Sequence, residues 1–246
     1  MFNNIPPITR NIIIINIIVF IISNLVYRDE LFNALAAFYP FSPNFHSWQI
    51  ITHMFMHGSL MHILFNMLTL WSFGPVLEQS LGEKKYLILY FISGLGGFFL
   101  FNLWNFIEVQ QITSAMEALG LNVSEIYTKA AASYKGNMNI TANTQEGVEL
   151  SQSLYNVLRT PMVGASGAIF GVVAAFATLY PDAKLIFMFI PFPVKAKFIL
   201  PIIIIVSIFL GFSGNVGGIA HFAHVGGALV GFLLALSWKK HLYRFH

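Results

Sequence analysis

The chain has 246 residues, of which 57% are hydrophobic and 9% are charged, and its mean hydropathy is +0.71. Because about a quarter of the residues in a soluble domain are charged, this composition excludes an ordinary soluble protein. The absence of cysteine excludes a disulfide framework, a thiolate nucleophile and a cysteine-ligated metal. The formal net charge of +3 comes without a basic stripe, so no nucleic-acid partner is expected.

Six apolar segments are predicted to cross a lipid bilayer. Backbone groups in hydrocarbon must be hydrogen-bonded within their own segment, so each segment is expected to be helical. The segments run approximately over residues 11–27, 60–77, 86–107, 164–180, 198–212 and 224–238. No small-residue cleavage site follows the first segment, so this segment is expected to be an uncleaved transmembrane helix and not a signal peptide. The sequence thus predicts an all-α membrane protein with six transmembrane helices in one domain of residues 1–246.

The distribution of Lys and Arg predicts the orientation. With six spans, both termini lie on one side, and that side holds nine of the thirteen basic residues. The opposite side holds the other four, together with seven of the ten acidic residues. Because basic residues concentrate in cytoplasmic loops, both termini are predicted to be cytoplasmic.

Three connections carry further predictions. Residues 28–52, between the first two helices, contain Pro40, Pro43 and several aromatic residues, which is typical of an interfacial loop with short helical turns. Residues 108–161 form a polar insert between the third and fourth helices, which is expected outside the cytoplasm with one or two surface helices. Residues 181–197 are expected to form a cytoplasmic hairpin or a strand-like interfacial loop.

Strongly polar side chains inside a membrane are costly, so each is a functional candidate. His62 and Asn66 are four residues apart and share one face of the second predicted helix, for which Ser59 is a plausible N-cap. Both side chains can donate to an oxygen that carries developing negative charge. A metal or haem site and ordinary interhelical hydrogen bonding are the alternatives; His53 and His57 lack the glutamate of the H-E-x-x-H zinc pattern.

A glycine-flanked serine opens the fourth predicted helix. Ser166 stands between Gly164 and Gly167, where free N–H groups and the positive end of the helix dipole favour an oxyanion. The glycines allow the backbone to approach a substrate carbonyl and a neighbouring helix. The alternative is simple helix packing, in which small residues at spacing four form an interhelical contact.

His224 heads the sixth predicted helix, and Gly227 and Gly231 follow on one of its faces. If this face packs against Gly167 and Gly171, His224 lies near Ser166, and a serine beside a histidine is the minimum nucleophile–base pair. No Asp or Glu in a predicted helix lies at the membrane depth of Ser166 and His224, so the pair is expected to be a dyad without a carboxylate.

These segments closely resemble the rhomboid intramembrane proteases, over roughly residues 48–97 and 164–232. The resemblance rests on the G-x-S-G element at Gly164–Gly167, on the element formed by His53, His57, His62 and Asn66, and on Ala223-His224 followed by Gly227. Residues 74–82, with Glu78 at their centre, look like the family's G-x-x-x-E-x-x-x-G. The resemblance implies a rhomboid-like helical bundle.

The family resemblance also implies residue roles. Ser166 would be the nucleophile and His224 its general base and then acid, while the Ser166 N–H, His62 and Asn66 would hold the oxyanion. Gly164, Gly167 and Gly227 would be substrate-binding or packing glycines, and His57 and Glu78 would be structural. His221 is expected to be a loop or cap residue. Gln49 follows Trp48 where family members often have arginine, a departure that bears on loop stability.

The function predicted on this basis is intramembrane serine endopeptidase activity, with no metal or other cofactor. The expected partners are the lipid bilayer and single-span membrane proteins whose helix unwinds near the outer surface. The expected location is a bacterial plasma (inner) membrane. Two alternatives remain: a non-catalytic rhomboid-fold protein that binds membrane clients, and a histidine-ligated cytochrome or metal transporter, which would leave Gly164–Gly167 and Asn66 without a role.

Overall fold

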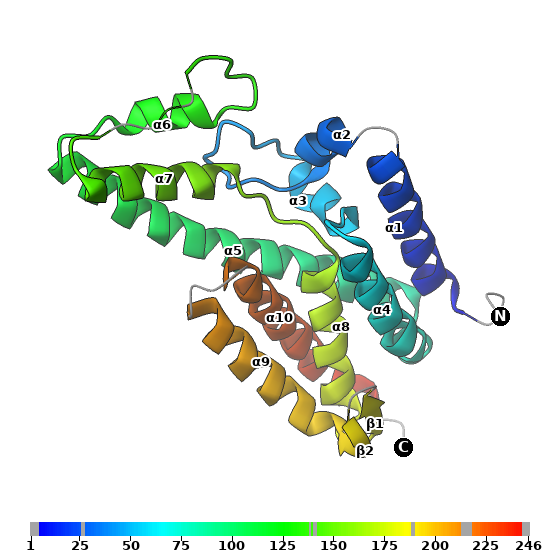
Figure 1. Cartoon of the computed structure of the whole chain (residues 1–246). Coiled ribbons are helices and arrows are strands. Elements are labelled where there is room, and N and C mark those ends of the chain that lie inside the picture. Colours follow the sequence, from blue (N-terminus) through cyan, green and yellow to red (C-terminus); the bar gives the residue numbers. More distant parts are fainter. Residues whose placement is uncertain are drawn as a thin grey trace.

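The computed structural model describes residues 5–25, 28–137, 139, 142–187, 190–212 and 218–242. The protein is a bundle of helices with a small hairpin at one end (Figure 1). The elements are α1 (Pro7–Leu25), α2 (Arg28–Leu35), α3 (Gln49–Thr52), the 3-10 turn η2 (His53–Phe55), α4 (Leu60–Leu81), α5 (Glu83–Ala118), α6 (Val123–Ala130), α7 (Gln145–Arg159), α8 (Ser166–Leu179), β1 (Lys184–Phe187), β2 (Ile190–Lys195), α9 (Ala196–Phe212) and α10 (Gly218–Leu242).

Each of the six predicted segments coincides with a helix: α1, α4, α5, α8, α9 and α10. Among the residues described, α1, α4, α5 and α10 are long and apolar enough to cross a membrane, and α8 is a shorter apolar helix. Large apolar side chains such as Ile18, Ile205 and Phe209 are exposed on the outside of the bundle, as lipid contact requires. The mainly helical membrane fold is confirmed, while a count of six spanning helices stays a prediction.

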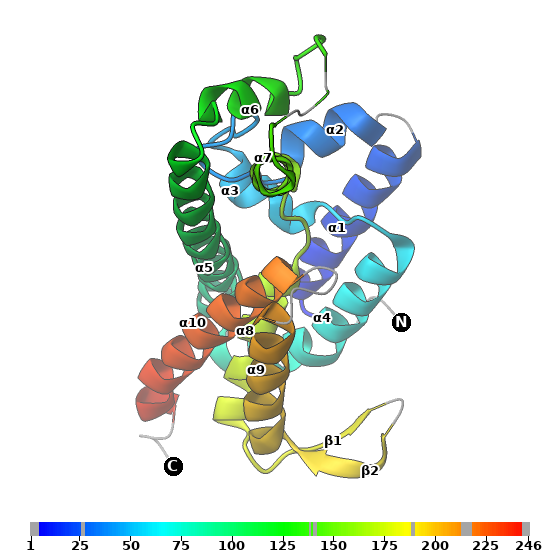
Figure 2. The same cartoon turned by 60° about the vertical axis from the view of Figure 1, so that its left-hand side comes forward.

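Helix α8 lies inside the bundle and packs against α5 and α10 (Figure 2). Twelve of its fourteen residues are buried. A helix that is apolar on every side is suited to such a position. Because neighbouring helices surround it, α8 does not need the length of a helix that faces lipid.

The carboxylate of Glu78 joins α4 to the start of α1. It accepts hydrogen bonds from the backbone N–H groups of Ile8 (2.8 Å) and Thr9 (2.7 Å) and from the Thr9 hydroxyl (2.7 Å). The first N–H groups of a helix have no partner within the helix, so Glu78 caps α1 from a distant part of the chain.

The loop between α1 and α4 contains α2, α3 and η2, as predicted for an interfacial loop with helical turns. Gln49 is fully buried within it. Its Oε1 accepts from the backbone N–H groups of His46 (3.1 Å) and Phe38 (3.4 Å). Its Nε2 donates to the carbonyl oxygens of Asn33 (3.1 Å) and Asn44 (3.3 Å). A glutamine therefore ties this loop together at the position where the family often has arginine.

The predicted polar insert has a small apolar core of its own. Helix α5 continues past residue 107, the predicted end of its segment, to Ala118. Its apolar residues Val109, Ile112 and Met116 follow helical spacing and pack against α6 and α7. The polar residues between them, such as Gln110 and Gln111, are exposed, which is why the sequence there resembles a loop.

Two residues of the α1–α4 loop, Asn44 and Ser42, dock it onto the insert. The Asn44 side chain donates to the Ala130 carbonyl oxygen (2.9 Å) and accepts from the Ala132 N–H (2.7 Å). The Ser42 hydroxyl donates to the Leu158 carbonyl oxygen (2.7 Å). The loop and the insert therefore form one connected cap on the bundle.

Strands β1 and β2 form an antiparallel hairpin, which agrees with the hairpin predicted for residues 181–197. Asp182 accepts hydrogen bonds from Lys195 (3.2 Å) and Lys197 (3.1 Å) at its base. Both views place the hairpin and the helices α6 and α7 at opposite ends of the bundle (Figures 1 and 2).

Candidate active site

Ser166 and His224 lie within hydrogen-bond distance of each other. The His224 Nε2 is 3.0 Å from the Ser166 Oγ. Ser166 is the first residue of α8, and His224 lies one to two turns into α10. The two residues are separated by 58 positions in the sequence and meet where the two helices cross.

Glycines allow α8 and α10 to approach this closely. A Cβ added to Gly227 would overlap the Gly167 carbonyl oxygen, and one added to Gly231 would overlap the Gly171 carbonyl oxygen. On the side of α5, a Cβ on Gly97 would lie 2.8 Å from the Ala223 carbonyl oxygen. The predicted match between the glycine faces of α8 and α10 is therefore present in the structure.

Two aromatic rings contact the imidazole ring of His224. Phe170, one turn along α8 from Ser166, stacks on it with ring centroids 4.1 Å apart and planes 4° from parallel. His221 meets it edge-on at 5.8 Å. No Asp or Glu in the described part of the chain hydrogen-bonds to His224, and the stacked Phe170 ring limits the orientations open to the imidazole.

His62 and Asn66 of α4 lie beside Gly164, two residues before Ser166. A Cβ on Gly164 would stand 2.7 Å from the His62 Nε2 and 3.7 Å from the Asn66 Nδ2. Gly164 also has a φ of +115°, a conformation that side chains with a Cβ rarely adopt. Both constraints require glycine, so this residue lets the segment before α8 lie against the His62 and Asn66 side chains.

Several hydrogen-bond donors around this point are unused. The Asn66 Nδ2 is buried without a partner among the residues described. The N–H groups of Ser166, Gly167 and Ala168 precede the first internal hydrogen bond of α8, from the Ile169 N–H to the Ala165 carbonyl oxygen. Buried donors without partners are rare and call for an explanation, and a transient negative oxygen would supply one.

His53 and His57 support the site from outside it. The His53 carbonyl oxygen accepts from the Gly164 N–H (2.9 Å), and its Nδ1 lies 2.8 Å from the Gln49 carbonyl oxygen. The His57 ring packs edge-on against the His62 ring at 5.0 Å. Burial lowers the pKa of both His53 and His57 to about 4, so both rings are neutral at pH 7.

Sequence reasoning missed two residues of this arrangement. The sequence alone assigns no role to His53, although its backbone holds Gly164, and it does not include Phe170 in the site. The helical spacing of Phe170 from Ser166 was the available signal. Within the described ranges, no group of three or more His, Cys, Asp or Glu side chains is placed to hold a metal ion.

Comparison with known proteins gives one family. Residues 44–109 and 135–240 match the Rhomboid domain. A protein from Klebsiella pneumoniae called rhomboid protease GlpG is 41% identical over 93 residues, which are 38% of this chain and 34% of that protein. One of the same name from Salmonella choleraesuis is 38% identical over 91 residues, 36% of this chain and 32% of that protein. The aligned region thus spans about a third of these relatives.

Proposed function

Because this chain belongs to the rhomboid family, we propose that it is an intramembrane serine endopeptidase that cleaves single-span membrane proteins near the outer surface of the bilayer. The observation that carries the proposal is the 3.0 Å contact between the His224 Nε2 and the Ser166 Oγ. A histidine at this distance can accept the serine proton.

In the first step, His224 takes the proton from Ser166 while the Ser166 Oγ attacks the carbonyl carbon of the substrate. The tetrahedral intermediate collapses, His224 gives its proton to the leaving amine, and the acyl group remains on Ser166. Water, deprotonated by His224, then attacks the acyl carbon; the bond to the Ser166 Oγ breaks, His224 returns the proton to Ser166, and the second product leaves as a carboxylic acid. The reaction needs no cofactor, since serine supplies the nucleophile and histidine moves the proton.

The negative oxygen of each intermediate would be held by the Ser166 N–H, the Asn66 amide and the His62 ring. The free N–H groups at the start of α8 and the unpartnered Asn66 Nδ2 support this assignment. Donors fixed before the reaction stabilise the developing charge without reorganisation.

The arrangement of the bundle supports an active site near one membrane surface. Ser166 is at the end of α8 that faces the insert, while the hairpin lies at the other end (Figure 1). With the termini cytoplasmic in a bacterial inner membrane, the insert and Ser166 would face the outer side, from which water can reach the acyl-enzyme. A substrate helix would have to unwind there, and small residues at the cut would fit between glycine-faced helices.

The proposal is tested by cleavage of a single-span reporter in liposomes. Wild-type protein is expected to cut it, while Ser166→Ala and His224→Ala are expected to lose cleavage with unchanged thermal unfolding. Ser237→Ala serves as the matched control, because Ser237 is an exposed serine in α10 whose hydroxyl donates to the Leu234 carbonyl oxygen. Cleavage that persists in Ser166→Ala would overturn the serine mechanism. A wild-type protein that binds the reporter without cutting it would favour the client-binding alternative.

A further inference from the structure

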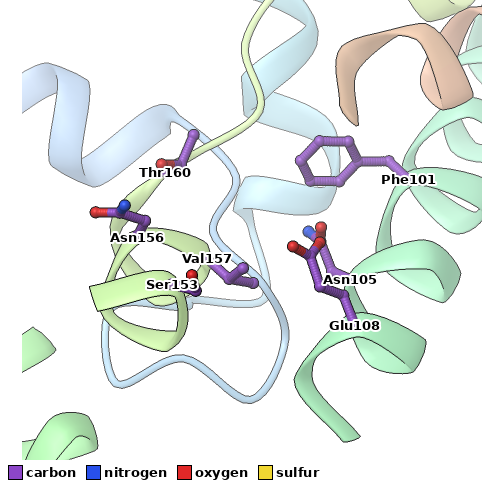
Figure 3. A pocket seen from close by; sticks show the side chains of 7 residues that line it. All are labelled: Phe101, Asn105, Glu108, Ser153, Asn156, Val157 and Thr160. Atoms are coloured by element: carbon purple, nitrogen blue, oxygen red, sulfur yellow. The ribbon is translucent and has the colours of Figure 1, made fainter. Parts of the chain in front are cut away.

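A polar cavity of about 180 Å³ lies between α5 and α7, apart from the catalytic pair (Figure 3). Helix α5 contributes one wall and the insert helix α7 the other. Its lining includes Phe101, Asn105 and Glu108 from α5 and Ser153, Asn156 and Thr160 at the α7 side. The cavity is smaller than the roughly 300–1,000 Å³ of small-molecule sites, so it fits a group the size of one amino-acid side chain.

Two acceptor oxygens on side chains that line this cavity have no hydrogen-bond partner in the described structure. They are the Oε2 of Glu108 and the Oδ1 of Asn105, both buried. The Asn105 residue is 1% exposed. Figure 3 shows the two side chains together on the α5 wall, facing α7. No Lys, Arg or His within the described ranges forms an ion pair with Glu108.

These unpaired acceptors define the chemistry of the missing partner. A carboxylate and an amide oxygen that are left unpaired in a buried place cost free energy, which a cationic donor would recover. Ser153 and Thr160 add hydroxyl oxygens that can also accept, whereas the Asn156 Oδ1 already accepts from Gln152 (2.9 Å). An ammonium or guanidinium group meets all of these requirements.

Each wall of the cavity is linked to the proposed catalytic pair, one wall through packed side chains and the other through the chain itself. Phe101 packs in one buried cluster with Met162 and Ala223, and Ala223 directly precedes His224. Thr160 is six residues before Ser166, at the start of the segment that leads into α8. These two links join the cavity to the segments that carry Ser166 and His224.

We propose that this cavity binds a Lys or Arg side chain of the substrate, in the segment outside the membrane that flanks the cut. The inference rests on the proposed function, since it assigns a specificity site to the same reaction. Residues 110–134, between the two parts of the Rhomboid match, include α6 and the end of α5, which pack against α7. Residues 110–134 thus hold the α7 wall in place and add substrate selection to the enzyme.

The test uses single-span reporters with Lys or Gln at successive positions on either side of the cut, in liposomes without primary-amine lipids. Wild-type enzyme is expected to cleave one Lys reporter with a kcat/KM about tenfold higher than that of its Gln counterpart. This is the factor expected from the free energy of one charge-assisted hydrogen bond. Glu108→Gln is expected to abolish this preference, so that the Lys and Gln reporters are cleaved with the same kcat/KM. Glu117→Gln, which removes the same charge further along α5, is expected to retain it.

Binding to the Ser166→Ala protein separates this inference from the proposed function. Tighter binding of the Lys reporter that depends on Glu108 would support the cavity assignment even if wild-type protein cleaved nothing. Equal binding and equal cleavage of Lys and Gln reporters at every position would overturn it. An effect of added phosphatidylethanolamine that depends on Glu108, with no Lys preference, would assign the cavity to a lipid amine and equally overturn the substrate assignment.

Discussion

The His224 ring is oriented by an aromatic side chain. In a serine protease triad, a carboxylate holds the imidazole in its working orientation. Here Phe170 stacks on the ring at 4.1 Å, and Phe170 belongs to the same helix as Ser166. In the proposed mechanism, one short helix would thus supply both the nucleophile and the residue that orients its base, and no charge would have to be buried in lipid.

The unpartnered Asn66 amide leads to a prediction about rate. If it donates to the oxyanion, Asn66→Ala will lower kcat by about 10²- to 10³-fold with little change in KM, as expected when one oxyanion donor is removed. Reporter kinetics in liposomes measure this effect. Ser72→Ala, at an exposed position on the same helix, should leave kcat unchanged. An unaltered kcat in Asn66→Ala would remove Asn66 from the reaction.

The buried histidines predict loss of stability in acid. Burial lowers the pKa of His53 and His57 to about 4, below the ordinary value of 6.5. As the pH falls from 6.5 towards 4, the unfolded chain binds protons that the folded protein does not, so unfolding becomes more favourable. The Tm in detergent should therefore fall across this window.

His57→Gln should make that fall smaller, because it removes one of the two groups. Tm values measured between about pH 7 and pH 4 for wild type and variant check this. The same pH dependence in both proteins would show that His57 does not contribute to it.

At the scale of helices, the contact between Ser166 and His224 depends on how closely α8 and α10 pack. Interhelical packing in a membrane relies on small residues that let backbones approach. Since Gly227 touches the Gly167 backbone next to Ser166, any added side chain there has to separate the two helices.

Gly227→Val is therefore expected to destabilise the protein by about 1–3 kcal/mol, the usual cost of overpacking, and to abolish cleavage. Thermal unfolding and the reporter assay measure the two effects. Gly58→Ala is the matched control, because a Cβ there would meet its nearest neighbour, a Val163 methyl group, at 3.9 Å. Near-normal cleavage in Gly227→Val would mean that the Ser166–His224 distance does not depend on this contact.

Helical periodicity in the sequence predicted much of the site. The spacing of His62 and Asn66, and of the glycines on α8 and α10, is enough to place these residues on shared faces of their helices. The same periodicity did not predict the backbone hydrogen bond from Gly164 to His53 or the cavity between α5 and α7, since both join segments far apart in the chain. The extension of α5 was missed because its apolar stripe is interrupted by polar residues.

For the whole molecule, the two ends of the bundle differ in architecture. One end carries α6, α7 and the α1–α4 loop, joined through Asn44 and Ser42, and the other carries the hairpin with its Asp182–lysine pairs (Figure 2). Such an asymmetric arrangement presents a different surface to each side of the membrane. The proposed orientation places the insert outside and the hairpin in the cytoplasm.

The absence of natural cysteines makes this orientation directly measurable. Ser124→Cys in α6 should react with a membrane-impermeant maleimide added to intact cells, because exposed insert residues would face outward. Lys184→Cys in the hairpin should react only after the membrane is permeabilised. The reverse pattern would place the termini outside and contradict the distribution of basic residues.

If Ser166 is a nucleophile activated by His224, a fluorophosphonate will modify it, and mass spectrometry of the labelled protein identifies the modified residue. We expect phosphonylation of Ser166, its loss in His224→Ala and its retention in Ser237→Ala. Labelling at another serine, or equal labelling of Ser166 without His224, would contradict the claim that these two residues act as a pair.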